Sequence, residues 1–249
     1  MDLPLEGLTV IEVGQALAGP LAGVVLADMG ADVIKVEKPD GGDDARLWGP
    51  PYGPDGVTSL YFHGQNRSKR SITLDLKRPE DIAELHRLCE SADILIQNLR
   101  PGVVEEIGIG PEAMLERHPR LIYCSIWAFG FEGPMKMKPG FDPLLQAYGG
   151  MMSVTGQEGG PPTFCGASIN DKATGMFCTI GALAALRLRL AVALHQRQAR
   201  RSHRRGRGRK LGRRDRLGRD RRLGLGLRQR GADQRGQERA APQRRGAML

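Results

Sequence analysis

The chain has 249 residues, which allows one large or two small domains, and its 37 Lys and Arg exceed its 28 Asp and Glu by a formal net charge of +9. Residues 195–249 hold 19 Arg and 1 Lys against 3 Asp and 1 Glu, a net +16, which leaves residues 1–194 at −7. The basic character therefore belongs to the tail, and the mildly acidic body is long enough to bury a real core.

Cysteine usage and hydropathy exclude several classes of protein. The four cysteines form no CxxC pair and no metal-ligand spacing, so we predict reduced thiols and no metal site. The N-terminus lacks the basic and apolar segments of a secretory signal. No uncharged apolar run reaches the roughly 18 residues of a membrane span, because two arginines interrupt residues 176–194. A soluble, cytoplasmic protein without membrane association is expected.

The first third of the body predicts a strand, a helix and a second strand. Residues 8–13 and 32–37 are β-branched, apolar runs typical of buried strands. A helical pattern covers residues 21–29, with Pro20 suited to its first turn and Gly30 to its C-terminal cap. This βαβ order favours a parallel sheet. Residues 39–66, rich in Gly, Pro and Asp, predict a long functional loop.

The alternation continues along the chain. Strands are predicted over residues 71–76, 93–96 and 121–126, and helices over 79–90, near Val103 and over 112–117. Residues 1–140 therefore predict an α/β, Rossmann-like, doubly wound, mostly parallel sheet. No GxGxxG or P-loop pattern is present, which gives nucleotide-dependent redox or ATP chemistry no support.

The predicted secondary structure changes after Pro139, from alternating strands and helices to helices alone. Residues 141–194 predict a helical arm without strands, with helices over 142–152 and from Asp171 to about Leu190. Residues 195–249 contain no Phe, Tyr, Trp, Ile or Val. Such a segment cannot bury enough apolar surface to offset the entropy of ordering, so we predict a disordered basic tail.

One decapeptide, residues 166–175, combines flanking glycines with a carboxylate at the start of a small-residue helix. Ser168-x-x-Asp171 fits a capping box, in which Asp171 would only bind backbone N–H groups. The other interpretation makes Asp171 a carboxylate that a ligand can approach. The decapeptide by itself leaves both open.

Eight motifs in order resemble the family III CoA-transferases, the group that includes formyl-CoA:oxalate CoA-transferase and carnitine CoA-transferase. The resemblance runs from Leu5 to about Leu190 and rests on residues 7–10, 17–20, 30–37, 41–46, 66–72, 98–102, 139–142 and 166–175. It implies that Asp171 is the catalytic nucleophile, which attacks an acyl-CoA thioester and then carries CoA itself as an aspartyl thioester. The dipole of a helix N-terminus would favour the ionised form of this carboxylate.

The resemblance also implies contacts with coenzyme A, which is substrate here and not a permanently bound cofactor. The residues are Leu17, Ala18, Lys38, Leu74, Asp75, Leu76, Lys77, Asn98, Leu99, Arg100 and Lys138. Several follow strands, the usual ligand edge of an open α/β sheet. For each charged residue the alternative is a solvated surface charge. Gln15 could face the thioester and Trp48 could cover the acyl pocket, although a turn residue and a packed aromatic side chain fit the same positions. The histidines are assigned no catalytic role.

A racemase is the first alternative activity. The α-methylacyl-CoA racemases of the same superfamily pair an acid near Asp171 with a His in a Gly-His-Asp segment. Here that segment reads Gly140-Phe141-Asp142. Phenylalanine cannot transfer a proton, which favours CoA transfer between an acyl-CoA and a carboxylic acid acceptor.

The tail leads to three further expectations. Members of the family continue through a smaller second domain and form interlocked homodimers, but the family pattern here stops after Leu190. The abrupt change predicts a truncated or frameshifted reading, and with it a CoA-binding but inactive fragment. The alternative is that the +16 tail binds nucleic acid non-specifically through phosphate contacts.

Overall fold

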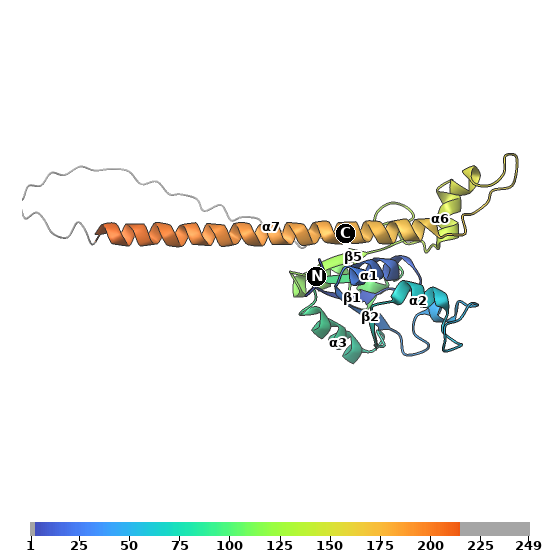
Figure 1. Ribbon diagram of the computed structural model, residues 1–249, viewed down its shortest axis with the longest axis horizontal. Helices are drawn as coiled ribbons and strands as arrows, with labels where there is room; N and C mark the ends of the chain where they lie inside the picture. Colours follow the sequence, from blue (N-terminus) through green and yellow to red (C-terminus); the bar gives the residue numbers. More distant parts are fainter. Residues whose placement is uncertain (1–2, 215–249) are drawn as a thin grey trace, which may run out of the picture. The chain divides into compact units, whose positions relative to one another are not determined.

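The computed structural model describes residues 3–214, and the part of the chain before helix α7 (Ile169–Arg214) contains a five-stranded sheet (Figure 1). The strands are β1 Thr9–Val13, β2 Asp32–Glu37, β3 Arg70–Thr73, β4 Ile94–Gln97 and β5 Ile122–Ser125. Their order is β3-β2-β1-β4-β5, and every neighbouring pair is parallel. The predicted α/β fold with a parallel sheet is confirmed. The strand order reverses between β1 and β4, so their carboxyl ends flank a topological switch point, where ligands bind in such sheets.

The helices connect the strands and form the arm. Their bounds are α1 Ala18–Asp28, α2 Leu60–Asn66, α3 Pro79–Cys89, α4 Val103–Glu106, α5 Pro111–Arg117, α6 Asp142–Tyr148 and α7 Ile169–Arg214, with 3₁₀ turns η1 Asp44–Leu47 and η2 Met151–Val154. Proline occupies the first turn of α3, α5 and α6, where its missing N–H costs no intrahelical hydrogen bond.

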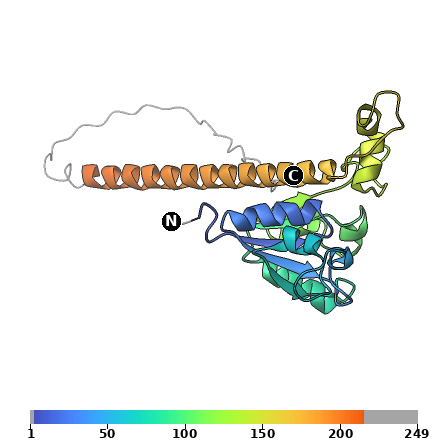
Figure 2. The same ribbon diagram turned by 45° about the vertical axis from the view of Figure 1, so that its right-hand side comes forward.

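Helices cover both faces of the sheet (Figure 2). On one face, α1 and the first part of α7 pack against strand residues such as Val10, Val33 and Ile96, and Ala182, Ala185 and Leu186 of α7 belong to this cluster. On the other face, α3, α4 and α5 pack against the alternate strand positions. This explains why the strands read as continuous apolar runs, since both of their faces are buried.

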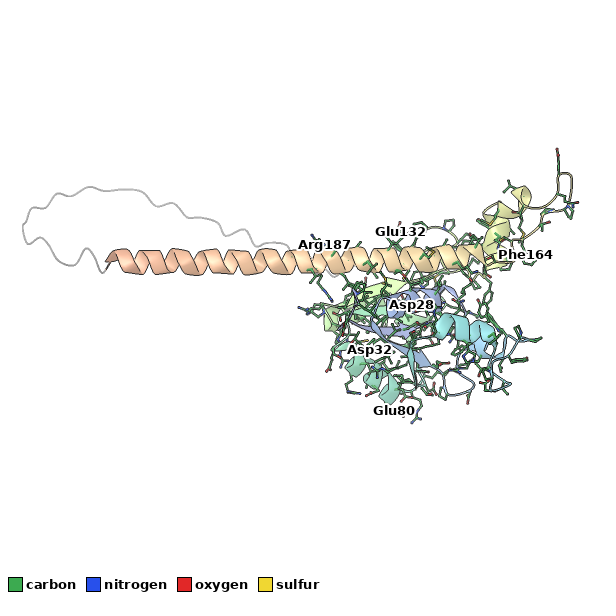
Figure 3. All side chains as sticks on the ribbon, viewed as in Figure 1. Asp28, Asp32, Glu80, Glu132, Phe164 and Arg187 are labelled. Atoms are coloured by element: carbon green, nitrogen blue, oxygen red, sulfur yellow. The ribbon has the colours of Figure 1, made fainter. Side chains whose placement is uncertain are left out.

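The segment at residues 39–66 is more ordered than the sequence predicts, because η1 and α2 lie within it. Glu37 accepts two hydrogen bonds from Arg46, and the guanidinium of Arg46 lies 3.9 Å from the ring centroid of Phe62. Just beyond this segment, ion pairs join Arg67 and Arg70 to two acidic residues labelled in Figure 3, Asp28 and Asp32. Contacts between residues distant in sequence therefore hold a segment that the sequence predicts to be a long loop.

Strand β3 ends at Thr73, three residues before the predicted end. Its neighbour β2 ends at Glu37, which pairs with Thr73, so no strand is left to bond the next residues. Leu74 still donates its N–H to the Glu37 carbonyl, but the N–H of Asp75 turns to the carboxylate of Asp81 at 2.8 Å. The prediction of strand through residue 76 is therefore wrong.

Helix α7 runs past the predicted end near Leu190, to Arg214. Residues 195–214 are thus helical where the sequence predicts disorder, and residues 215–249 lie outside the described part. Ala, Arg, Gln, Leu and Lys are good helix formers, and a helix completes its hydrogen bonds locally without burial. The pattern of tertiary contacts divides the chain into two units, with a boundary after Leu186. The predicted division into three parts, with boundaries at residues 140 and 194, stays a prediction.

One stretch of α7, Ile169–Val192, is long and apolar enough by length and composition to cross a membrane. The buried core helix of a soluble protein passes the same test. Three residues of this stretch, Ala182, Ala185 and Leu186, precede the division after Leu186 and are buried in the core against the sheet.

Candidate active site

A cavity of about 420 Å³ opens at the switch point, beside the carboxyl ends of β1 and β4. Nine of the fourteen predicted site residues line it: Gln15, Leu17, Ala18, Trp48, Asn98, Leu99, Arg100, Lys138 and Asp171. They come from five separate parts of the chain, and only the fold brings them together. The size suits part of a large ligand.

Five of the predicted contacts do not line this cavity. Lys38 pairs with Asp44, its Nζ 2.5 Å from the carboxylate Oδ1. Leu74 is buried in the core and Leu76 packs against it, while Asp75 and Lys77 lie beyond the end of β3. As β3 is the edge strand and β1 lies two strands away, these residues are separated from the switch point by β2.

The turn after β1 is fixed by side chains from three other segments. Asn98 binds both backbone groups of Gln15: its Oδ1 accepts the N–H and its Nδ2 donates to the carbonyl, each at 2.8 Å. Lys35 donates to the carbonyl of Gly14 at 2.6 Å. Asp43 accepts the N–H of Ala16 at 3.1 Å. Side chains of three other segments therefore fix the backbone of the turn that places Gln15 in the cavity wall.

Asp171 stands in the first turn of α7, and its neighbour Asp142 makes the cap of that helix. Asp142 Oδ1 accepts the N–H of Asn170 at 2.7 Å and of Asp171 at 3.0 Å. Gln146 donates to the other oxygen of Asp142 and exchanges two hydrogen bonds with the backbone of Cys165. The capping-box interpretation is therefore wrong in this structure, since Asp142 binds the N–H groups that Ser168 would have capped.

The Asp171 carboxylate is left half-buried at the cavity. Within residues 3–192, whose side chains the structure describes, no hydrogen bond to its oxygens is found. Burial, and then the nearby negative charge of Asp142, raise its pKa to about 6. The shift is opposite to the direction expected from a helix N-terminus alone. At neutral pH most of the group is still ionised, and a partly desolvated carboxylate is a better nucleophile than a solvated one.

Tyr61 adds a neutral donor near these acids. Burial, followed by the charges of Asp171, Asp43 and Asp142, raises the pKa of its hydroxyl to about 12. Tyr61 therefore keeps its proton at all ordinary pH values. Its ring packs against Trp48 with the centroids 5.4 Å apart. The indole of Trp48 is thereby held at the cavity wall, where the sequence predicted a cover for an acyl group.

Sequence reasoning missed several residues of the wall, among them Asp43, Asp44, Trp127, Phe141 and Thr174. Asp43 and Phe141 lie inside motifs that carry the family resemblance, so the resemblance was the signal that could have identified them as residues of the site. Thr174 stands three residues after Asp171 and so shares its helix face. Trp127 follows β5 and had no signal beyond its place at a strand end.

The site offers cations for an anionic ligand and no arrangement for a metal. Arg100 and Lys138 line the cavity and are suited to phosphate groups. Over the described residues, no group of three or more His, Cys, Asp or Glu side chains could hold a metal ion. His86 and His118 pair with each other in α3 and after α5, and neither lines the cavity.

Comparisons with known proteins agree with this geometry. A model of CoA-transferase family III matches residues 5–192. A succinate–glutarate CoA-transferase of Agrobacterium fabrum is 46% identical over 187 residues, covering 74% of this chain and 47% of its own length. A succinyl-CoA–D-citramalate CoA-transferase of Chloroflexus aurantiacus is 43% identical over 195 residues, covering 78% of this chain and 46% of its own.

Solved structures give the same result. A CAIB/BAIF family protein from Brucella suis has 41% identity and a TM-score of 0.74, over 78% of this chain and 51% of that one. Rv3272 from Mycobacterium tuberculosis has 38% identity and a TM-score of 0.68, over 74% and 50%. The chain spans about half the length of the curated relatives it matches. From the family model and these relatives, the chain belongs to CoA-transferase family III.

Proposed function

We propose that this chain takes part in CoA transfer from an acyl-CoA thioester to a carboxylic acid, with Asp171 as the nucleophile. The observation that supports it is the position of the Asp171 carboxylate, half-buried at a cavity and free of cap bonding because Asp142 caps the helix. A carboxylate held in this way can attack a ligand carbonyl.

The reaction proceeds by carboxylate and thiolate exchange. Asp171 attacks the thioester carbonyl, the carbon–sulfur bond breaks, and CoA leaves as the thiolate with a mixed anhydride on Asp171. The thiolate attacks the Asp171 carbonyl, which releases the first acid as a carboxylate and leaves an aspartyl-CoA thioester. The acceptor carboxylate repeats these two steps in reverse order, and Asp171 is regenerated. No proton, electron or metal is consumed.

Coenzyme A would lie across the switch point. Leu17, Ala18 and Leu99 offer apolar and backbone contacts to the pantetheine arm, while Arg100 and Lys138 offer charge to phosphates. Lys38 and the segment from Leu74 to Lys77 belong to this proposal only if the ligand extends along the sheet edge beyond the cavity. Gln15 and Trp48, which line the cavity, would contact the acyl group of the acyl-CoA.

Dicarboxylates are the first substrates to try. The relatives are named for succinate with glutarate and for succinyl-CoA with D-citramalate, and another for acetyl-CoA with oxalate. Succinyl-CoA as donor and glutarate as acceptor therefore form the first pair. Transfer is favoured over racemisation because Phe141, which lines the cavity, cannot accept a proton. The cytoplasmic location expected from the sequence stays a proposal, and the homodimer is one that the resemblance implies for full-length members of the family.

Intact-protein mass spectrometry tests the first covalent step. The purified chain is mixed with succinyl-CoA, acetyl-CoA or oxalyl-CoA and quenched with hydroxylamine or borohydride. We expect an adduct that peptide mapping places on Asp171 and that is absent from Asp171→Ala and from the isosteric Asp171→Asn. If the chain binds CoA but gives no adduct with any donor, the nucleophile assignment for this chain is overturned and a CoA-binding role without turnover is supported.

A further inference from the structure

Four charged side chains are buried in a row that ends at the cavity wall, each at most 2% exposed. Lys69 Nζ lies 2.8 Å from Glu12 Oε2, Glu12 Oε1 lies 3.0 Å from Lys35 Nζ, and Lys35 Nζ lies 3.0 Å from Asp43 Oδ2. Two positive and two negative groups alternate, so the row is neutral. Buried charges are tolerated when they are paired in this way.

The rest of the fold makes room for this row. An added Cβ at Gly23 of α1 would lie 1.9 Å from Glu12 Oε2, so only glycine fits over the carboxylate. Lys69 is held further by the carbonyl of Pro20 at 2.8 Å and by Asn66 Oδ1 at 2.9 Å. Lys69, at the end of the row away from Asp43, is thus fixed by two hydrogen bonds besides its ion pair with Glu12.

Asp43 ends the row and is the member that reaches the cavity wall. Its Oδ1 accepts the N–H of Ala16 at 3.1 Å and the N–H of Ala45 at 3.0 Å. Ala16 belongs to the turn that carries Gln15, and Ala45 belongs to η1, whose C-cap residue is Trp48. One carboxylate oxygen of Asp43 therefore binds the backbone of two segments of the cavity wall, its own segment and the turn 27 residues before it in sequence.

The turn at Ala16 needs such a restraint. Ala16 has φ +64°, in the left-handed region that non-glycine residues rarely adopt. Side chains outside the turn hold its backbone in this conformation, and the charged acceptor among them is Asp43. A charged acceptor gives a stronger hydrogen bond than a neutral one.

We propose that Asp43 is a positioning residue for the acyl-CoA site: its carboxylate, fixed by Lys35, holds the Gln15 turn and the Trp48 segment at the spacing that the ligand requires. The inference rests on the proposed function for the identity of the ligand. The alternative is a purely structural role, in which Asp43 only neutralises Lys35.

Asp43→Asn separates these roles, because Asn is nearly the same shape. The Asn side chain has only one acceptor oxygen. Its NH₂ group must therefore face another donor, either Lys35 Nζ or the backbone N–H groups of Ala16 and Ala45. The double variant Asp43→Leu with Lys35→Met restores the neutral balance of the row and leaves no side-chain acceptor for the N–H groups of Ala16 and Ala45. Asp40→Asn, at an exposed residue of the same loop, is the matched control.

Hydrogen exchange read by mass spectrometry reports on position without requiring activity. In Asp43→Asn we expect faster exchange in residues 14–18 and 43–48, with wild-type exchange in β1, β4 and β5. The double variant should regain thermal stability and keep the fast exchange in residues 43–48, a segment that does not contain the Lys35–Gly14 hydrogen bond also lost in this variant. Unchanged exchange in both segments, or restoration of protection by the double variant, overturns the positioning role. If Asp43→Asn does not fold, the same comparison is made on the charge-balanced double variant.

Ligand affinity supplies the second measurement. The chain has two tryptophans, Trp48 and Trp127, and both line the cavity, so quenching of intrinsic fluorescence reports CoA binding directly. Loss of a charge-assisted hydrogen bond predicts a roughly tenfold weaker Kd for CoA in Asp43→Asn and in the double variant. A wild-type Kd in a variant with fast local exchange contradicts the link to the ligand. Absence of CoA binding by the wild-type chain contradicts the proposed function instead, and the exchange result still decides whether Asp43 positions the two walls.

Discussion

Asp142 accepts a hydrogen bond from the backbone N–H of Asp171 at 3.0 Å, so one carboxylate holds the backbone of the residue that carries the other. The two acids have different environments. Asp142 is 2% exposed and bonded at both oxygens, whereas Asp171 is half-buried at the cavity. Asp142 therefore acts on Asp171 in two ways, by fixing its position and by raising its pKa.

The pH dependence of acylation follows from Asp171. The attacking form is the carboxylate, and its pKa is about 6, so the rate of adduct formation should rise with pH and level off above this value. Below it, the rate should fall about tenfold per pH unit. Single-turnover adduct formation between pH 4.5 and 8 measures the midpoint. A midpoint near 4 would show that the carboxylate is not desolvated in solution.

The same pKa predicts that ionised Asp171 destabilises the fold. A carboxyl whose pKa is raised on folding favours the protonated form, so its stability contribution grows as pH falls from about 6 toward the ordinary value of 3.8. At pH 8, Asp171→Asn should be more stable than wild type by about 1 kcal/mol after allowance for solvent screening. Urea denaturation at pH 8 and pH 4 measures this, and an equal effect at both values contradicts it.

Removing the cap at Asp142 should have two separable effects. Asp142→Ala leaves the N–H groups of Asn170 and Asp171 without their acceptor, which should cost about 1–2 kcal/mol of stability. It also removes the charge beside Asp171, so the midpoint of the acylation profile should move to lower pH. Glu158→Gln, at an exposed acid of the same arm, is the control. An unchanged midpoint would leave burial as the whole cause of the shift.

Close packing of α7 on α1 should depend on Gly175. A Cβ there would lie 2.7 Å from the Ala18 carbonyl and 3.1 Å from Leu21, and both neighbours belong to α1. Gly175→Ala should therefore destabilise by about 1–3 kcal/mol and weaken CoA binding, because Ala18 and Asp171 line the cavity from the two helices. Gly64→Ala in α2 meets nothing within 4 Å and should instead stabilise slightly. Equal effects in the two variants would contradict the close contact.

The buried His86–His118 pair should make the fold sensitive to acid. Their ring nitrogens lie 3.2 Å apart. For both residues, burial and then the charge of Arg117 lower the pKa. The charge of His118 lowers the pKa of His86 further, whereas Glu90 opposes the shift at His118. Histidines with a depressed folded pKa lose stability as pH falls below the ordinary value of 6.5, since the unfolded chain binds the proton first. His118→Gln should reduce the drop in Tm between pH 7 and 5. An identical drop would assign the sensitivity elsewhere.

Local patterns in the sequence determined most of the fold. The β-branched runs specified five strands to within a residue or two, apart from the end of β3, and prolines stand at the starts of α3, α5 and α6. The same local segments carried the family resemblance and pointed to Asp171. These features depend on neighbours in sequence, so a single chain shows them.

The tertiary structure alone decided which distant side chains hold the residues of the site in position. Asn98 bonds Gln15 across 83 residues, Asp142 caps α7 across 28, and Asp43 reaches Ala16 across 27. None of these pairs leaves a periodic signal, because a hydrogen bond between distant residues depends on where the sheet places two strand ends. Ser168 looked like the cap of α7 from its spacing, and Asp142 took that place because the fold brings a buried carboxylate to the helix N-terminus.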